Sequence, residues 1–352
     1  MSGVRRKLSF ANIGAVYVWI AIIIIFGIWV PSTFLTVATF KQVLNGNAIV
    51  ALLALSLLIP LSAGVFDLSI AYNATLTCVV LTKLIVGGVP LWLAIVAAIF
   101  TGLLVGLGNA CVVVLMRVDS FIGTLATGSL VSALVTLVTG NLVIESPKLS
   151  GTFLQIGQAT VLGFTLPVFY VIVVGGIIWY VLEATATGRR LYATGFNART
   201  ARLAGVRTDR LRFGALLASG FFAGVAGVVL ASYIGSGDPT VGPPYLLPAF
   251  AAAFLGATQL RAGRFNVPGT LIAILLLGTG ITGLGLAAAP QWSQDMFTGV
   301  VLIAALALTG VQRRGSARGR WTRKGGEPED VAVVEGAAGA HEAPLSTSSH
   351  AT

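Results

Sequence analysis

The chain has 352 residues, of which 56% are hydrophobic and only 10% are charged, and its formal net charge is +10. A soluble chain of this length needs about 25% charged residues to cover its core with a polar surface. The composition therefore excludes a water-soluble enzyme and a nucleic-acid-binding domain, despite the positive charge. Cys78 and Cys111 both lie in apolar runs, which excludes a disulfide scaffold and a cysteine-based zinc cluster.

Uncharged apolar runs predict the membrane spans, because a helix needs about 20 apolar residues to cross the hydrocarbon core. The first run lacks the features of a cleaved signal peptide, so we expect a permanent helix there. In chain order the predicted spans are 13–30, 47–64, 68–86, 90–116, 120–140, 160–182, 213–234, 248–260, 267–286 and 294–311. The sequence thus predicts an all-α membrane protein with about ten transmembrane helices.

The positive charges give this topology an orientation, because cytoplasmic loops carry an excess of Lys and Arg. With a cytoplasmic N-terminus, all but three of the 22 Lys and Arg residues fall in cytoplasmic segments. The three exceptions are Lys41, Lys83 and Lys148. One helix too many or too few would move every later loop across the membrane, so we expect both termini in the cytoplasm.

Composition divides the chain into three parts. Residues 1–12 form a short cytoplasmic N-terminus, and residues 13–312 form the transmembrane domain, with a long cytoplasmic loop over 183–212. Residues 313–352 are first basic and then rich in Gly, Ala, Ser and acidic residues, with no apolar period. Such a composition cannot bury enough apolar area to fold, which predicts a disordered cytoplasmic tail.

Glycine pairs predict close helix packing, because association in lipid relies on small residues that let backbones approach. Gly102 and Gly106 have this GxxxG spacing, and so do Gly220 and Gly224. Together they indicate a tightly packed helix bundle.

Ionisable residues, which would mark ion or proton pathways inside a membrane, are almost absent from the predicted spans. Asp67 lies in the short break between the second and third spans, where we expect it to cap the third helix. Both histidines lie in the tail. This pattern argues against an ion-coupled transporter, a membrane metalloenzyme and an intramembrane protease, and it predicts no metal site.

Neutral polar side chains within the spans are candidates for a translocation path, since they can hydrogen-bond a polyhydroxylated solute. Asn73 and Asn109 are the better candidates, because a hydroxyl often bonds a carbonyl of its own helix and an amide is harder to satisfy there. The other candidates are Thr124, Thr127 and Thr282.

The loop 183–212 is the most distinctive segment, with seven arginines between two spans. Apolar Ala201, Leu203 and Ala204 stand among these arginines and predict a short helix over 198–205 that Gly205 ends. A short helix outside the membrane suits a docking element for a partner protein. It could equally rest on anionic lipid headgroups.

Four stretches in register resemble the ribose- and xylose-type permeases of ABC transporters. Residues 187–197, followed by Ala201, Leu203, Ala204, Gly205 and Val206, look like the coupling loop of that family. Gly64–Ser69 is similar to its Gly-Gly-Ile-Asp-Leu-Ser element, Phe121–Leu125 to its Phe-Ile-Ala-Thr-Leu, and 238–278 to its C-terminal signature. The resemblance covers residues 10–312 and implies a type II-like ABC importer permease bundle.

The sequence departs from the family pattern at several of these positions. Val65 and Phe66 replace a glycine and an isoleucine, and Phe196 replaces a glycine. Leu247 and Pro248 stand where the family often carries an acidic pair. These last two lie on the predicted outer face, where the family docks its binding protein, so the identity of that partner and of the sugar stays open.

The resemblance implies a membrane subunit of a bacterial monosaccharide importer in the inner membrane. Such a subunit pairs with a second permease chain, identical or similar, while two ATP-binding subunits dock beneath it and an extracytoplasmic solute-binding protein delivers the solute. The chain has no Gly-rich phosphate loop ending in Lys-Ser or Lys-Thr, so it is not expected to be an enzyme or to bind a cofactor, and its partner would use ATP and Mg.

The same resemblance implies the site residues. The surface that couples to the ATP-binding subunit would comprise Gly188, Arg189, Tyr192, Gly195, Asn197 and Gly205. A separate structural motif would comprise Gly64, Asp67 and Ser69. Two alternatives remain open at this point, an ATP-independent transporter or channel for a small neutral solute, and a structural membrane scaffold.

Overall fold

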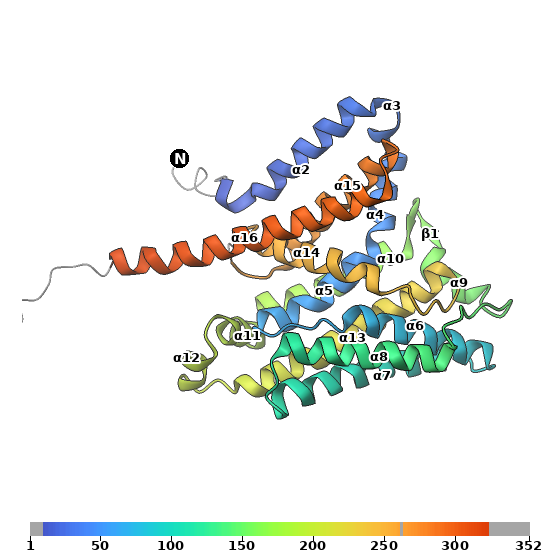
Figure 1. Cartoon of the computed structure of the whole chain (residues 1–352), viewed down its shortest axis with the longest axis horizontal. Coiled ribbons are helices and arrows are strands. Elements are labelled where there is room, and N and C mark those ends of the chain that lie inside the picture. The colour runs from blue at the N-terminus through green and yellow to red at the C-terminus, as the bar shows by residue number, and fades with distance from the viewer. Residues whose placement is uncertain (1–9, 261–262, 324–352) are drawn as a thin grey trace, which may run out of the picture. The chain divides into compact units, whose positions relative to one another are not determined.

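The computed structural model describes residues 10–260 and 263–323, and the side chains of 15–260 and 263–307 (Figure 1). The helices of the first half are α2 (Phe10–Trp29), α3 (Pro31–Phe34), α4 (Val37–Gly46), α5 (Ala48–Ser62), α6 (Ile70–Val86), α7 (Leu91–Ala110) with η1 (Cys111–Leu115), α8 (Ser120–Thr139) and α9 (Thr152–Gln158). Those of the second half are α10 (Leu166–Trp179) with η2 (Tyr180–Ala184), α11 (Ala186–Phe196), α12 (Ala198–Leu203), α13 (Thr208–Ile234), η3 (Pro243–Tyr245), α14 (Leu246–Ala257), α15 (Val267–Leu286) and α16 (Gln291–Arg323).

Several of these helices can cross a membrane by their length and composition. Among the described residues five do so, namely Leu91–Leu115, Ser120–Thr139, Leu166–Ala184, Thr208–Ile234 and Val267–Leu286. The pair α4 and α5, bent by 45°, makes a sixth if it forms one span. Ala15–Trp29, Ile70–Val86 and Pro243–Ala257 are shorter apolar helices. The described part of the chain thus contains five or six helices that are long and apolar enough to span a membrane, whereas the sequence has ten apolar runs.

The boundaries differ from the sequence prediction in three places. The helix α4, whose first turn Thr36 caps through a hydrogen bond from Thr39 N, precedes the predicted second span. Residues 160–165, predicted to be membrane-spanning, form a small antiparallel hairpin of β1 (Thr160–Val161) and β2 (Phe164–Thr165), because Leu162 and Gly163 turn the chain at positive φ. The last helix extends to Arg323, into the segment predicted as a tail, and the remainder of that segment, 324–352, lies outside the described residues.

The core of the bundle is built on α13, which contacts α5, α6 and α7 (Figure 1). The predicted glycine pairs meet there. A Cβ on Gly102 would lie 2.8 Å from Gly224 Cα, and one on Gly220 would lie 2.6 Å from both Gly102 O and Gly106 Cα. Asn73 of α6 closes the same crossing, since its Nδ2 donates to Gly102 O and to Gly220 O, both at 3.1 Å. The close packing predicted from the glycine spacing is therefore confirmed.

Substituting Gly220 by alanine is expected to lower the stability of the bundle by about 1–3 kcal/mol, because the added methyl group overlaps the backbone of α7. Gly214 provides a matched control on the same helix, since a Cβ there meets nothing within 4 Å and Gly214→Ala gains helix propensity. Thermal unfolding in detergent measures both. Equal unfolding midpoints for the two variants would contradict the packing argument.

Candidate functional site

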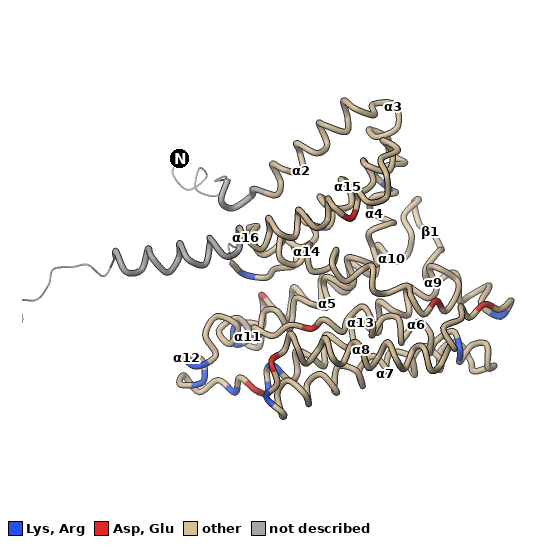
Figure 2. Tube along the Cα trace, in the orientation of Figure 1, with Lys and Arg blue, Asp and Glu red and all other residues tan. Residues whose placement is uncertain are grey.

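The long loop between η2 and α13 folds into a helical hairpin formed by α11 and α12, here called the coupling hairpin (Ala186–Leu203). Thr185 Oγ1 accepts a hydrogen bond from Gly188 N and begins α11, and Asn197 Oδ1 accepts one from Thr200 N and begins α12. Gly205, at a φ of +81°, ends the hairpin as the sequence predicts. Figure 2 shows Lys and Arg residues gathered around α11, α12 and the neighbouring helix ends.

Two glycines let the coupling hairpin lie directly on the helix core. Gly195 faces the carbonyl of Ser62, with which any Cβ would overlap, and a Cβ on Gly64 would lie only 3.0 Å from Gly195 Cα. Gly188 is buried against the carbonyls of Val181 and Leu182 in the same way. These positions require glycine because backbone meets backbone there. The hairpin thus rests on the end of α5 and on the linker that follows it.

Tyr192 ties the coupling hairpin to the loop between α14 and α15. Its hydroxyl donates to Phe265 O at 2.6 Å and lies 3.3 Å from Glu183 Oε1, while the Arg264 guanidinium stacks 3.9 Å from its ring centroid. Burial, with the nearby Glu183 carboxylate, raises the pKa of Tyr192 to about 12, so the hydroxyl remains a hydrogen-bond donor at neutral pH. The tyrosine therefore anchors the hairpin to its own chain.

The outward surface of the coupling hairpin contains Arg189, Asn197 and Gly205 of the predicted set, together with residues outside that set. Phe196 is 80% exposed and Leu203 is 84% exposed, and Arg189 and Arg199 are exposed as well. Of the residues predicted to dock a partner, Gly188, Tyr192 and Gly195 face the helix core instead. Sequence reasoning did not include the large apolar side chains of this arginine-rich loop, although exposed apolar patches often mark an interaction site.

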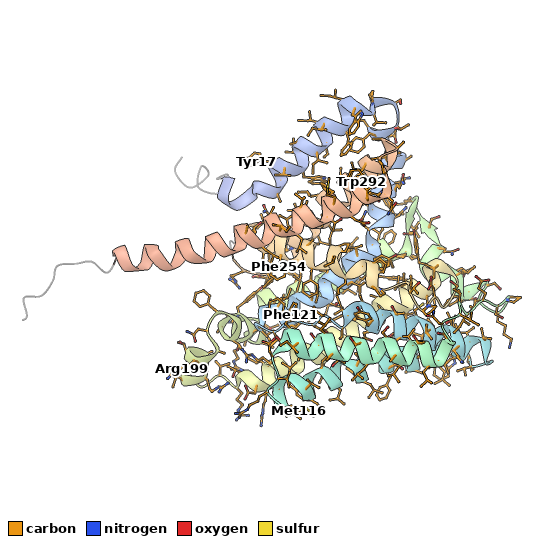
Figure 3. All side chains as sticks on the ribbon, in the orientation of Figure 1. Tyr17, Met116, Phe121, Arg199, Phe254 and Trp292 are labelled. Atoms are coloured by element: carbon orange, nitrogen blue, oxygen red, sulfur yellow. The ribbon has the colours of Figure 1, made fainter. Side chains whose placement is uncertain are left out.

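The linker between α5 and α6, residues 63–69, connects the coupling hairpin with α8. Phe66 N donates to Ser120 Oγ, and Leu68 N donates to Thr124 Oγ1, both at 3.0 Å. The Phe66 ring also lies 6.2 Å from Phe121 of α8 and 6.3 Å from Phe254 of α14 (Figure 3). A movement of the linker would thus change its contacts with both α8 and α14.

Asp67 forms the centre of a buried polar cluster beneath the hairpin and is 1% exposed. Its Oδ1 accepts from Ser69 N at 3.1 Å, from Ser69 Oγ at 2.7 Å and from Asn109 Nδ2 at 3.1 Å. The expectation that Asp67 caps the third span is corrected here: Ser69 occupies the N-cap position of α6, and the carboxylate instead joins the linker to α7.

The Asp67 cluster is short of hydrogen-bond donors and of positive charge. Asp67 Oδ2, Asn109 Oδ1 and Ser219 Oγ are buried without a hydrogen-bond partner in the described structure. The ion pair found among the described residues is Arg202–Asp209, so it does not neutralise this carboxylate. In the linker, outside both helices, burial raises the pKa of the Asp67 carboxyl, and the hydrogen bonds from Ser69 only partly oppose that shift.

The five residues predicted to line a translocation path lie on several helices and make different contacts. Asn73 and Asn109 are buried and bond within the helix packing, as described above, and Thr124 binds the linker. Thr127 Oγ1 donates to Gly123 O of its own helix, and Thr282 is half-buried on α15. The described residues contain no group of three or more His, Cys, Asp or Glu side chains that could hold a metal ion.

Comparison with known proteins identifies the class of this bundle. Residues 39–306 match the family described as "Branched-chain amino acid transport system / permease component". The chain belongs to this permease family. It is a multi-pass protein of the bacterial inner membrane, and the resemblance seen in the sequence is confirmed.

Curated relatives of this permease cover most of its length. It is 28% identical to the ribose import permease protein RbsC of Haemophilus influenzae over 292 residues, which are 82% of this chain and 90% of the relative. It is 31% identical to RbsC of Bacillus subtilis over 287 residues, 82% of this chain and 89% of the relative. The autoinducer 2 import system permease protein LsrC of Escherichia coli is 30% identical over 293 residues, 83% of this chain and 85% of the relative. No solved structure matches the permease.

The Asp67→Asn variant is expected to raise the unfolding midpoint at neutral pH. The amide keeps the oxygen that accepts from Ser69 and Asn109, carries no charge, and offers a donor to the unpartnered Asn109 Oδ1. Asp67→Ala instead leaves those donors without an acceptor and is expected to cost about 1–3 kcal/mol. Thermal unfolding of both variants beside the wild type measures this difference.

The wild-type permease is also expected to lose stability with rising pH. Because the folded-state pKa of Asp67 is raised, folding favours the protonated acid, and this contribution is lost as the pH rises from about 4 through the raised pKa. In Asp67→Asn this part of the pH dependence should disappear. An unchanged pH profile in that variant would show that the carboxyl does not titrate there.

Proposed function

We propose that the permease is the membrane-spanning subunit of an ATP-driven ABC importer, which moves a monosaccharide or a similar small polar solute delivered by an extracytoplasmic binding protein. The observation that carries this proposal is the coupling hairpin, whose exposed outer surface and glycine-packed inner surface suit an element that passes force from a partner to the helices. Relatives named as ribose and autoinducer 2 import permeases support the solute class.

The proposed topology has ten crossings with both termini in the cytoplasm. The five long helices, the bent pair α4–α5, the three shorter apolar helices and α16 would supply these crossings. The coupling hairpin and the turns before α8 and α15 then lie on the arginine-rich cytoplasmic side. Lys83 and Lys148 lie on the opposite side, where their ammonium groups donate to the carbonyls of Val138 and Val86.

Two ATP-binding subunits would each receive one coupling hairpin from a pair of permease chains. Phe196 and Leu203 would enter an apolar groove of the ATP-binding subunit, and Arg189 and Arg199 would meet acidic groups at its rim. The hairpin, held by Gly195 and Tyr192, would pass the motion to the linker 63–69 and so to α8 and α14. This arrangement favours an importer driven by a partner over the ATP-independent alternative.

Substituting Phe196 or Leu203 by aspartate is expected to weaken binding of the ATP-binding subunit by tenfold or more, since loss of a central apolar contact costs about 2 kcal/mol. Leu162→Asp is the matched control, because Leu162 is 85% exposed but lies in the β1–β2 turn. Co-purification and solute-stimulated ATP hydrolysis measure the effect. A loss of equal size in the control would remove the hairpin from the proposed interface.

Reconstitution in proteoliposomes tests the function as a whole. The permease, the ATP-binding subunit and the binding protein together are expected to take up labelled ribose or autoinducer 2 when ATP is present. Omission of ATP or of either partner is expected to abolish uptake. Uptake by the permease alone would instead establish an ATP-independent transporter.

A further inference from the structure

A pocket of about 360 Å³ opens beside the coupling hairpin and has no role in the coupling scheme. Its charged walls come from Arg117 before α8, Arg202 of α12, and Asp209 and Arg212 of α13. Its apolar wall is formed by Val113, Val114 and Val118. We call it the arginine pocket. It lies where three segments far apart in the sequence meet.

Two of the three arginines in this pocket, Arg117 and Arg212, form no ion pair with the residues that the structure describes. Arg202 is satisfied, since its Nη2 lies 3.1 Å from Asp209 Oδ1 and from Thr208 Oγ1. Asp119, which also lines the pocket, is occupied with the first turn of α8, where its Oδ1 accepts from Phe121 N and Ile122 N. Neither carboxylate forms an ion pair with Arg117 or Arg212 in the described part of the chain.

Arg212 carries the most direct sign of a missing partner. Its Nε is buried and has no hydrogen-bond acceptor in the described structure. A buried donor without an acceptor costs about 1–3 kcal/mol, and more when the group is charged. Arg212 itself lines the cavity. An anion in that cavity would balance the surplus positive charge, and a rotation of the Arg212 side chain would let Nε donate to it.

We propose that the arginine pocket binds a phosphate group, and specifically the headgroup of an anionic phospholipid. Guanidinium groups match phosphate oxygens in charge and in the spacing of their donors. Leu115 and Met116 follow Val114 in the chain and are 67% and 70% exposed, so they offer acyl chains an apolar contact that a free phosphate ion would not need.

The orientation in the proposed function places this pocket at the cytoplasmic leaflet, where anionic lipids concentrate. The lipid would occupy the space between the α7–α8 turn and the coupling hairpin, with Gly64 and Val65 of the linker behind it. It would therefore contact the linker that also carries the buried Asp67. The inference rests on the proposed orientation but not on the transported solute, so lipid binding can be tested without transport.

The test compares two double variants with equal loss of charge. Arg117→Gln with Arg212→Gln removes the free arginines of the pocket, while Arg207→Gln with Arg210→Gln removes two exposed arginines that do not line it. The full-length permease in detergent is titrated with dioleoyl phosphatidylglycerol, and bound lipid is counted by native mass spectrometry. Dioleoyl phosphatidylcholine and inorganic phosphate form two further arms of the titration.

The pocket variant is expected to bind phosphatidylglycerol about tenfold more weakly than the wild type, and the control variant within about twofold. Phosphatidylcholine should bind weakly to all three proteins. Displacement of phosphatidylglycerol by inorganic phosphate at comparable concentration would show that the pocket takes free phosphate. An equal loss in both double variants would reveal only nonspecific charge attraction and overturn the proposal, as would no loss in either.

Arg212→Lys keeps the test valid if the double variant does not fold. Lysine retains the charge but has no donor at the position of Nε, so several-fold weaker binding of phosphatidylglycerol is expected. Thermal unfolding in the absence of lipid shows whether each protein is folded before it is titrated. Full binding by a folded Arg212→Lys variant would contradict the assignment of the buried Nε as a phosphate ligand.

Discussion

The backbones of α7 and α13 touch at Gly102, Gly106 and Gly220, and most of the described site depends on that contact. In lipid, apolar side chains gain nothing by packing on each other, so close backbone approach supplies the attraction between helices. At this crossing the Asn73 amide also donates to two helix carbonyls, Gly102 O and Gly220 O. A larger residue at the crossing would separate the helices and break these two hydrogen bonds.

The same crossing sets the spacing of the buried polar groups at one end of the bundle. Asn109 follows Gly106 on α7, and Ser219 precedes Gly220 on α13, so both side chains arrive beside Asp67 of the linker. The α12 helix and Arg212 come just before the crossing on the α13 side, which brings the coupling hairpin over the linker. Packing of α7 on α13 thus determines where the coupling hairpin and the linker meet.

The linker 63–69 carries side chains with two kinds of environment. On one side Asp67 is buried among neutral polar groups, and on the other Gly64 and Val65 border the arginine pocket. Its amides bond to Ser120 and Thr124, so it is held by side chains from α8 rather than by regular secondary structure. Such a segment can shift with fewer broken hydrogen bonds than a helix, which suits an element that links the hairpin to the bundle.

The sequence by itself determined the class of protein, the apolar helices, the glycine packing and the short helix that Gly205 ends, because hydropathy, charge and glycine spacing are properties of single segments. It named Gly188, Tyr192 and Gly195 as important but could not show that they face inward, since their contacts come from Leu182, Phe265 and Ser62. Only the tertiary structure gave Asp67 its partners on α7 and placed Arg117 beside Arg212. Those pairs are separated by tens of residues in the chain, and hydrogen bonds between distant segments are decided by how the helices cross.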